Sequence, residues 1–490
     1  MFSISEPFLF FDYFRVPAAV RERETPVWLD AQNPLSGFGR VTPDEAPRLL
    51  LWPQAERLAG EAGAPPPAEH RFGGATLFAS VVPDETLRHW LFQTNRDWRP
   101  SAAIEDAGGS RVASVWTDES SNLVLPFDPG EVMTNFWSEA YRGGDAARSD
   151  LRRLALRAYY FLRPAIPRGL QIAMRQRAAK VQGRQRFPRW PVEPSLHDFY
   201  DAIFALLAGL AGEAVPSISP WPHGRSWALV LTHDVETAAG VEKIPLLREL
   251  EAARGFRSSW NFVPERYATP DAVLDSLRQQ DCEIGVHGLR HDGRDLGSLR
   301  ILEQRLPTMR AYAERWSAVG FRSPATHRVW DWMPLLGFDY DSSSPDTDPY
   351  EPTPGGCCTW LPFFNRDLVE LPITVVQDHT LFVILRGEDA SAWQQKCDFL
   401  RDRGGMAVLL THPDYAGGGS PLVNAYADLL DRYREDSTVW HVLPRDVAEW
   451  WRRRAASSIA RRDGAWSVVG PAAADASITF AEPDRDAHVA

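Results

Sequence analysis

The chain has 490 residues, of which 44% are hydrophobic, 24% are charged and 11% are aromatic, and its formal net charge is −12. These values exclude a wholly disordered or fibrous chain, and the length predicts two folded units, or one large α/β domain with an extra module. The acidic balance argues against nucleic acid as a partner, because it does not favour counterion release from phosphates.

The sequence lacks the usual signs of a membrane-spanning or exported chain. The longest mainly apolar run, 202–215, contains Glu213 and is shorter than the roughly 18–20 residues that span a bilayer. The apolar run 8–11 lies between Glu6 and Asp12 with no basic residue before it, which is not the pattern of a secretory signal. Four cysteines without CxxC spacing indicate neither a disulfide framework nor a zinc–thiolate site. We therefore expect a cytoplasmic protein.

Residues 1–220 are predicted to form an N-terminal accessory module of the α+β type. Hydrophobic periodicity predicts short strands at 75–82, 111–116 and 122–125, and helices around 148–161 and 196–210. Repeated prolines predict extended chain at 188–191 and 216–222, because proline interrupts helices. The module contains no recognisable chemical motif, so the sequence does not indicate its role.

One segment reverses the acidic balance of the chain. Residues 151–190 contain eleven lysines and arginines and no aspartate or glutamate. One interpretation is that this segment packs against the acidic remainder, with arginine stems covering apolar surface. The other is peripheral contact with an anionic membrane, because leucines and aromatic residues are interleaved with the basic ones.

From Trp227 onward, short apolar runs alternate with helical patterns. Strands are predicted at 227–232, 256–263, 283–287, just before Arg322, and at 368–376, 381–385 and 407–412. Helices are predicted at 241–254, 271–280, 296–316, 390–403, 422–434 and 447–454, and a strand at 476–480 in the tail 456–490. Alternating strands and helices imply a parallel sheet with right-handed crossovers, so residues 225–455 are expected to form one α/β domain.

Ionisable side chains follow several predicted strands at their carboxyl ends, where parallel α/β folds gather functional groups. They are Asp234 and Glu236 after the first strand, His287 and His291 after the third, and Arg322 and His412 after two later strands. If a helix begins at His287, the spacing of four places both imidazoles on one face. Two histidines with Asp234 or Glu236 as a third ligand suit zinc.

The order of these motifs resembles that of the polysaccharide deacetylases, also called the NodB-homology domain or carbohydrate esterase family 4. That family carries TFDDG, HxxxH, RxPxG and a late LxH, and the matching segments here are 233–236, 287–291, 321–324 and 410–413. The resemblance covers about residues 225–455. It implies a distorted (β/α)7-type barrel and metal-dependent removal of N- or O-acyl groups from sugars.

The resemblance also implies a role for each matched residue. Asp234 matches the general base, and His287 and His291 match the two metal-binding histidines. Arg322 matches the arginine that orients the base, and His412 matches the general acid. The implied cofactor is a divalent metal, with zinc as the expected ion. The implied substrate is an N-acylated amino sugar in a polysaccharide or in its lipid- or nucleotide-linked precursor.

This sequence departs from the family pattern at two positions. Val235 stands where the family has its third metal ligand. Either Glu236, on the same side of an extended chain as Asp234, reaches the metal, or Asp234 is the ligand and Glu236 the base, or the site is weakened or lost. Thr326 replaces the last glycine of RxPxG, so the loop after Pro324 is expected to differ.

Other functions therefore stay open. The chain could hydrolyse another linear C–N bond, such as a formamide or an acylated polyamine, or bind saccharides without catalysis through a degenerate site. His233 is expected to face away from Asp234, because successive side chains of a strand alternate. His379 follows a predicted strand and is a further candidate for the site. The sequence does not indicate an oligomeric state.

Overall fold

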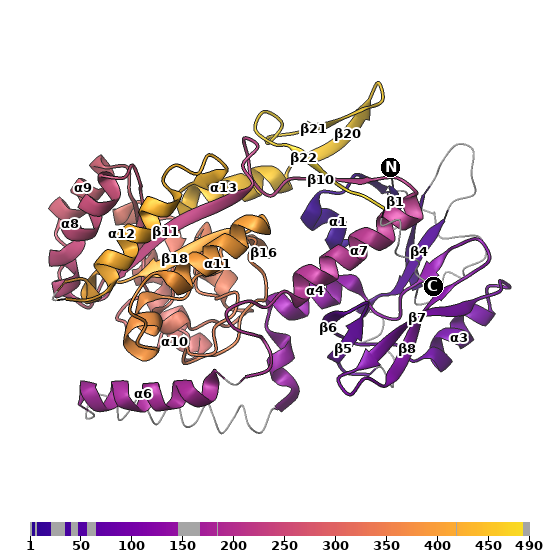
Figure 1. Cartoon of the computed structure of the whole chain (residues 1–490), viewed down its shortest axis with the longest axis horizontal. Coiled ribbons are helices and arrows are strands. Elements are labelled where there is room, and N and C mark those ends of the chain that lie inside the picture. Colours follow the sequence, from indigo (N-terminus) through magenta and orange to yellow (C-terminus); the bar gives the residue numbers. More distant parts are fainter. Residues whose placement is uncertain are drawn as a thin grey trace. The chain divides into compact units, whose positions relative to one another are not determined.

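The computed structural model describes residues 2–4, 7–20, 35–40, 48–55, 65–145, 167–183, 185–417 and 419–483. The chain divides into two compact units, coloured along the sequence in Figure 1. Unit 1 comprises residues 1–144, 194–219 and 453–490, and unit 2 comprises residues 145–193 and 220–452. Each unit thus joins segments that are distant in the sequence. The predicted helix at 148–161 lies outside the described residues.

Unit 1 is built on a mixed sheet of nine described strands in the order β2-β1-β3-β4-β9-β8-β7-β5-β6. The strands are β1 (Phe2–Ile4), β2 (Ala18–Val20), β3 (Leu35–Arg40), β4 (Leu49–Pro53), β5 (Ala68–Phe72), β6 (Ala75–Ala79), β7 (Arg99–Asp106), β8 (Arg111–Thr117) and β9 (Leu123–Val124). Its described helices are α1 (Leu9–Phe14), α3 (Asp84–Phe92), α4 (Pro129–Trp137), η1 (Ala140–Asp145) and α7 (Ser195–Ala211). Asp128 caps α4 by accepting a hydrogen bond from the Gly130 N–H.

The last described residues of the chain also belong to unit 1. The predicted tail strand is confirmed as β22 (Ile478–Ala481), which pairs antiparallel with β10 (Val215–Ile218), and β20 (Ser458–Arg462) forms a hairpin with β21 (Ala465–Val469).

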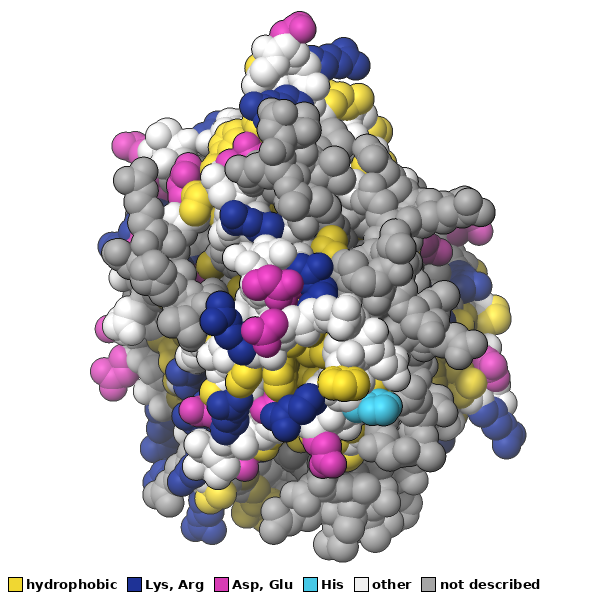
Figure 2. All heavy atoms as spheres, turned by 90° about the vertical axis from the view of Figure 1, so that its right-hand side faces the viewer, with side chains coloured by type: hydrophobic (Ala, Val, Ile, Leu, Met, Phe, Trp, Pro, Cys, Tyr) yellow, Lys and Arg dark blue, Asp and Glu magenta, His cyan; other side chains and the backbone are white. Residues whose placement is uncertain are grey.

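Figure 2 shows basic and acidic side chains of described residues lying interspersed on the face at the right of Figure 1.

Unit 2 contains a mainly parallel sheet of nine described strands in the order β16-β17-β15-β14-β13-β12-β11-β18, with β19 also beside β11. They are β11 (Trp227–Val235), β12 (Ser259–Phe262), β13 (Glu283–Val286), β14 (Gly320–Phe321), β15 (Tyr340–Asp341), β16 (Phe363–Asn365), β17 (Leu368–Glu370), β18 (Met406–Thr411) and β19 (Val439–His441). Every residue of β11 is buried, as its continuous apolar run predicts for a central parallel strand.

Residues 371–376 link the two ends of this sheet. Isolated parallel bridges join Ile373 to Pro345 and Val375 to Leu409 of β18. The Thr374 hydroxyl donates to the Met406 carbonyl at 2.7 Å and accepts from the Val408 N–H at 2.9 Å. A side chain thus supplies ladder bonds where the regular strand has ended after β17. The predicted α/β fold with a distorted (β/α) barrel is confirmed.

Helices surround the sheet of unit 2. They are α6 (Arg168–Gln182), α8 (Ala238–Ala252), α9 (Asp271–Gln279), α10 (Leu299–Trp316), α11 (Ser391–Asp402), α12 (Leu422–Tyr433) and α13 (Pro444–Ala455), with the short turns η3 (Pro324–Thr326), η4 (Met333–Leu336) and η6 (Pro413–Tyr415). The predicted strand at 381–385 is wrong, because these residues belong to or follow the π-helix η5 (His379–Ile384). A short apolar run does not by itself distinguish a buried strand from a buried helix. Within the described ranges, no helix has both the length and the apolar character needed to cross a membrane.

Candidate metal centre and active site

Two acidic residues come from the end of β11 and the turn into α8. Asp234 is buried, and its Oδ1 accepts a hydrogen bond from Nδ2 of Asn261 at 2.8 Å. The backbone N–H of Glu236 donates to Oδ2 of Asp414 at 2.9 Å, and the Thr237 hydroxyl donates to the same carboxylate. Asp414 thereby fixes the turn that presents Glu236.

The two histidines of the HxxxH motif come from the loop after β13. No helix begins at His287, and His291 itself has a positive φ of 54°. Gly288 has a φ of +62°, and a Cβ on it would lie 2.7 Å from ring atoms of Pro324. Only glycine combines this backbone conformation with such close packing. The loop brings the two imidazole centroids to 5.1 Å from each other without a helical turn.

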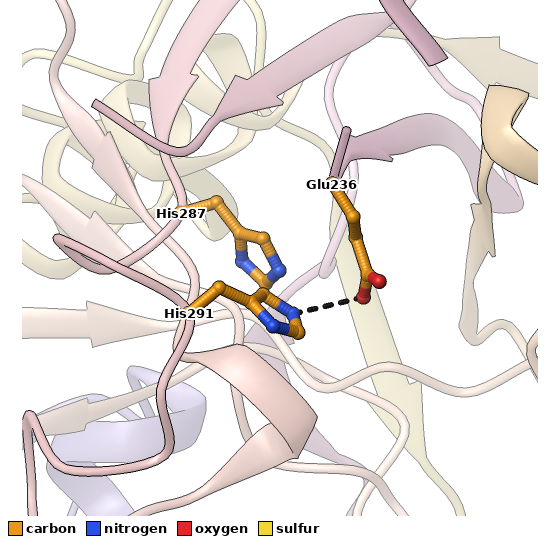
Figure 3. A group of neighbouring side chains, drawn as sticks. All are labelled: Glu236, His287 and His291. Carbon is orange, nitrogen blue, oxygen red and sulfur yellow. Dashed lines mark ion pairs between the residues drawn. The ribbon is translucent and has the colours of Figure 1, made fainter. Parts of the chain in front are cut away.

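The side chains of Glu236, His287 and His291 point toward one another (Figure 3). One ligand atom from each lies within 4.8 Å of the other two, and Oε1 of Glu236 is 2.9 Å from Nε2 of His291. Both Nε2 atoms are buried: among the described residues, that of His287 has no hydrogen-bond partner, and that of His291 contacts only the Glu236 carboxylate of the same cluster. Two imidazoles and a carboxylate are a ligand set of catalytic zinc sites. These residues therefore fit a divalent cation.

Arg322 determines which nitrogen of His287 faces this group. The carbonyl oxygen of Arg322 lies 3.1 Å from Nδ1 of His287. Because a carbonyl oxygen only accepts, Nδ1 carries the proton and Nε2 presents its lone pair. The buried guanidinium of Arg322 donates to the carbonyl and hydroxyl oxygens of Ser342 and to the hydroxyl of Thr232, at 2.6 to 3.0 Å.

Asp234 lies beside the cluster of Glu236, His287 and His291. Its Oδ2 is 3.6 Å from Nε2 of His287, and its Oδ1 is 3.6 Å from Nη1 of Arg322. Burial alone would raise the pKa of Asp234, but His287, Arg322 and His412 outweigh it and hold the pKa below its ordinary value. Burial likewise acts to raise the pKa of Glu236, and the neighbouring His291 and His412 lower it well below the usual range. Both carboxylates are therefore ionised at neutral pH.

His412 forms a buried pair with Asp378. Nδ1 of His412 lies 2.6 Å from Oδ1 of Asp378, and the backbone N–H of His412 donates to Oδ2 at 2.7 Å. Burial lowers the pKa of His412, but the Asp378 carboxylate more than compensates and raises it to about 10. Nε2 of His412 is 3.8 Å from Oε1 of Glu236. The sequence pattern does not single out Asp378, although this residue directly precedes the candidate His379.

The loop after Arg322 contains the Thr326 that stands where the resembled family has glycine. Ala325 and Thr326 both have left-handed backbone conformations, with φ of 55° and 52°. A β-branched residue is strained there, and such strain gathers at functional sites. Thr326 also lines the cavity beside the cluster of Glu236, His287 and His291.

A cleft of about 690 Å³ opens onto these residues, a volume within the range of small-molecule sites. Asp234, Glu236, His287, His291 and His412 all line it, whereas the guanidinium of Arg322 lies behind Asp234. His379 lies in the cleft wall, and α6 contributes Gln171, Arg175 and Gln182. His233 faces away, with Nε2 2.6 Å from Oε1 of Glu251. The structure thus brings all six predicted site residues into one region.

Known proteins similar to this chain were found only among solved structures. No protein-family model matches the chain, and no curated protein matches it. A Mycobacterium smegmatis protein classed as a polysaccharide deacetylase is 20% identical, with a TM-score of 0.41, over 47% of this chain and 92% of its own. PuuE allantoinase is 18% identical, with a TM-score of 0.39, over 48% of this chain and 93% of its own. A Pseudomonas aeruginosa protein classed as a polysaccharide deacetylase is also 18% identical, with a TM-score of 0.38, over 48% of this chain and 94% of its own.

The similarity to polysaccharide deacetylases that the motifs predict is thus found among solved structures as well. With identities of 18–20% and TM-scores below 0.5, these matches concern the fold and give no information on the substrate or activity of this chain.

Proposed function

We propose that this protein is a metal-dependent hydrolase that removes an N-acyl group, such as acetyl, from an amino sugar. One observation carries the proposal. Two buried imidazole nitrogens, of which that of His287 has no hydrogen-bond partner among the described residues and that of His291 contacts only Glu236, converge with the Glu236 carboxylate beside Asp234 and the His412–Asp378 pair. Buried polar atoms are normally paired, so an unpaired cluster of ligand atoms favours a bound cation.

Glu236, His287 and His291 would hold the ion. Among the alternatives that Val235 leaves open, this arrangement favours Glu236 as the third ligand and leaves Asp234 free to act as the base. Two nitrogen ligands and one carboxylate suit zinc. The chemistry that a bound divalent ion supplies is Lewis acidity toward an acyl carbonyl and a water molecule.

The remaining residues provide the proton transfers of amide hydrolysis. Asp234, ionised and next to the Arg322 guanidinium, acts as the general base. It takes a proton from a water molecule while the oxygen of that water bonds to the acyl carbon. The C–N bond then breaks, and His412 gives its Nε2 proton to the departing amine. Asp378 holds the imidazolium of His412 in place through Nδ1. The products are a carboxylic acid and an amino sugar.

The substrate that we propose is an amino sugar in a polysaccharide or in its lipid- or nucleotide-linked precursor. Support comes from the size of the cleft, about 690 Å³, and from its many polar side chains, which suit a sugar. Zinc as the metal and a cytoplasmic location stay predictions.

Metal analysis and product assays test this proposal. The purified protein is expected to carry one divalent ion per chain and to release acetate or formate from one member of a panel of acylamino sugars. His287→Ala should lose both properties, whereas His223→Ala, at an exposed histidine outside the cleft, should keep both. A protein that carries no metal, ignores chelators and yet binds saccharides would replace this proposal with the non-catalytic one. Release of formate from simple formamides alone would favour the other amide hydrolase.

A further inference from the structure

Helix α6 of unit 2 presents three different faces, each with its own kind of residue. The helix carries 15 residues from the strongly basic segment 151–190. One face attaches it to the barrel, the second lines the cleft and the third is exposed to solvent. The third face has no role in the proposed hydrolysis.

The attachment face is centred on Gln176 and Ala179. Nε2 of Gln176 donates to the Val383 carbonyl at 2.8 Å, and Arg386 donates to Oε1 of Gln176 at 3.0 Å. Ala179 is buried in a small apolar cluster with Tyr350 and Ile384. These contacts hold α6 beside η5, at the edge of the barrel unit in Figure 1.

The cleft face lies about a quarter-turn away from the attachment face. Gln171, Arg175, Ala178 and Gln182, spaced by three and four residues, all line the cleft. Arg175 donates to the Tyr350 carbonyl at 3.3 Å. Helix α6 therefore forms part of the cleft wall.

The outer face combines apolar and basic side chains. Leu170, Met174 and Val181 are 54%, 46% and 71% exposed, and their spacings of four and seven place them on one stripe. Arg177 lies in the same stripe, and Lys180 borders it; both are exposed. The segment 151–190 contains no acidic residue to neutralise them.

We propose that the outer face of α6 docks on a membrane that contains anionic lipids, and that a lipid-linked saccharide reaches the cleft along the same helix. An apolar stripe flanked by lysine and arginine is the pattern of helices that lie in a membrane interface. Anionic headgroups attract basic residues near the surface. A second copy of α6 would instead place basic stripes opposite each other, which opposes dimerisation through this face. Only the choice of a lipid-linked substrate rests on the proposed function.

Vesicle flotation of the full chain tests the docking. At low salt, the protein is expected to bind phosphatidylcholine vesicles with 30% phosphatidylglycerol and to bind pure phosphatidylcholine vesicles at least tenfold more weakly. The variant Leu170→Ser/Met174→Ser/Val181→Ser should lose at least tenfold in binding to the anionic vesicles. A matched control changes three other leucines of unit 2 that are 37%, 37% and 41% exposed (Leu246→Ser/Leu299→Ser/Leu335→Ser) and should bind like the unaltered protein.

Charge and oligomeric state provide the second test. Arg177→Gln and Lys180→Gln should each weaken binding to anionic vesicles about fivefold, and rising salt should weaken binding of the unaltered protein. Failure of the unaltered protein to bind at low salt, or equal binding by the serine triple variant, would overturn the proposal. So would a dimer in sedimentation that the triple variant dissociates.

Metal content and hydrolysis of a soluble acylamino sugar are measured in the same preparation of unaltered protein. If both are absent, the proposed function fails while the vesicle result stands or falls by itself.

Discussion

Two buried clusters of ionisable side chains lie on opposite sides of β11, and consecutive residues of this strand belong to them. Asp234 faces the cleft, and His233 faces the helices behind the sheet. In the rear cluster, Nε2 of His233 is 2.6 Å from Glu251, and Nδ1 is 2.7 Å from the Thr411 hydroxyl. Glu251 also accepts hydrogen bonds from Tyr426 at 2.6 Å and Ser258 at 2.7 Å.

The two clusters use the same residue types but differ in hydrogen bonding. Both nitrogens of His233 have partners, whereas in the part of the chain that the structure describes Nε2 of His287 has none and Nε2 of His291 contacts only Glu236, a candidate ligand itself. A fully paired buried network stabilises the fold. A cluster with unpaired ligand atoms is stable only if something else satisfies them. The comparison therefore separates a structural cluster from a ligand-binding one more sharply than residue identity does.

The largest effect should follow removal of a histidine from the front cluster, the one on the cleft side of β11 that contains Glu236, His287 and His291. His287→Ala or His291→Ala should lower kcat/KM by about ten-thousandfold, because the Lewis acid contributes several kcal/mol to the transition state. Metal content should fall in parallel, and the melting temperature should change little. Retention of bound metal by both single variants would contradict the assignment of the ligands.

The rear cluster should show the opposite response. Glu251→Ala should lower the free energy of unfolding by about 3–5 kcal/mol, because it leaves His233 and Arg248 buried without their acidic partner. Metal content per folded chain should stay at one. Denaturant unfolding measures the first quantity and metal analysis the second. A variant as stable as the unaltered protein would show that the rear cluster is not structural.

Much of the front cluster could be predicted from the sequence because its residues follow strands directly. Asp234, His287 and His412 each stand at the end of an apolar run, and the topology of parallel strands brings such ends together. Asp378 and Asp414 carry no such signal. Asp378 reaches His412 across 34 residues of sequence, and Asp414 reaches Glu236 across 178. Contacts of this kind depend on the finished fold.

Other differences have equally physical causes. The apolar run after His379 forms a π-helix instead of the predicted strand. The sequence could not separate the two, because a buried helix and a buried strand both carry continuous apolar residues. The side of α6 that lines the cleft could not be predicted, because its residues there are glutamines, an arginine, an alanine and an isoleucine, which have no distinctive pattern. The assembly of each unit from distant segments also leaves no local trace in the sequence.

Glu283 and His287 flank the same strand, since Glu283 begins β13 and His287 follows its other end. The two ends can therefore be compared as a structural and a ligand-binding position. Burial raises the pKa of Glu283 to about 7, although it accepts hydrogen bonds from the Tyr340 hydroxyl and the Arg445 N–H. A raised carboxyl pKa stabilises the fold at low pH, and this contribution is lost as pH rises from about 4.5 to about 7. Glu283→Gln lacks this loss. Its stability relative to the unaltered protein should therefore rise by about 3 kcal/mol over that interval.

Unfolding curves of both proteins at pH 5, 6, 7 and 8 measure this difference. Because the variant loses one hydrogen-bond acceptor at every pH, the test is how the difference in free energy of unfolding between the two proteins changes with pH. A constant difference between the two proteins would mean that Glu283 is ionised throughout.

The smallest effect that we predict concerns the orientation of His412. Asp378→Asn preserves the shape of the side chain but removes the charge that holds the imidazolium through Nδ1. We expect kcat to fall about a hundredfold, within the range of general acid catalysis, with KM and metal content little changed. Asp389→Asn, at an exposed aspartate that accepts from the Ser391 N–H, is the matched control and should keep full activity. Loss of metal in Asp378→Asn would instead mean that the His412–Asp378 pair holds the metal ligand Glu236 in position, because Nε2 of His412 lies only 3.8 Å from Oε1 of Glu236.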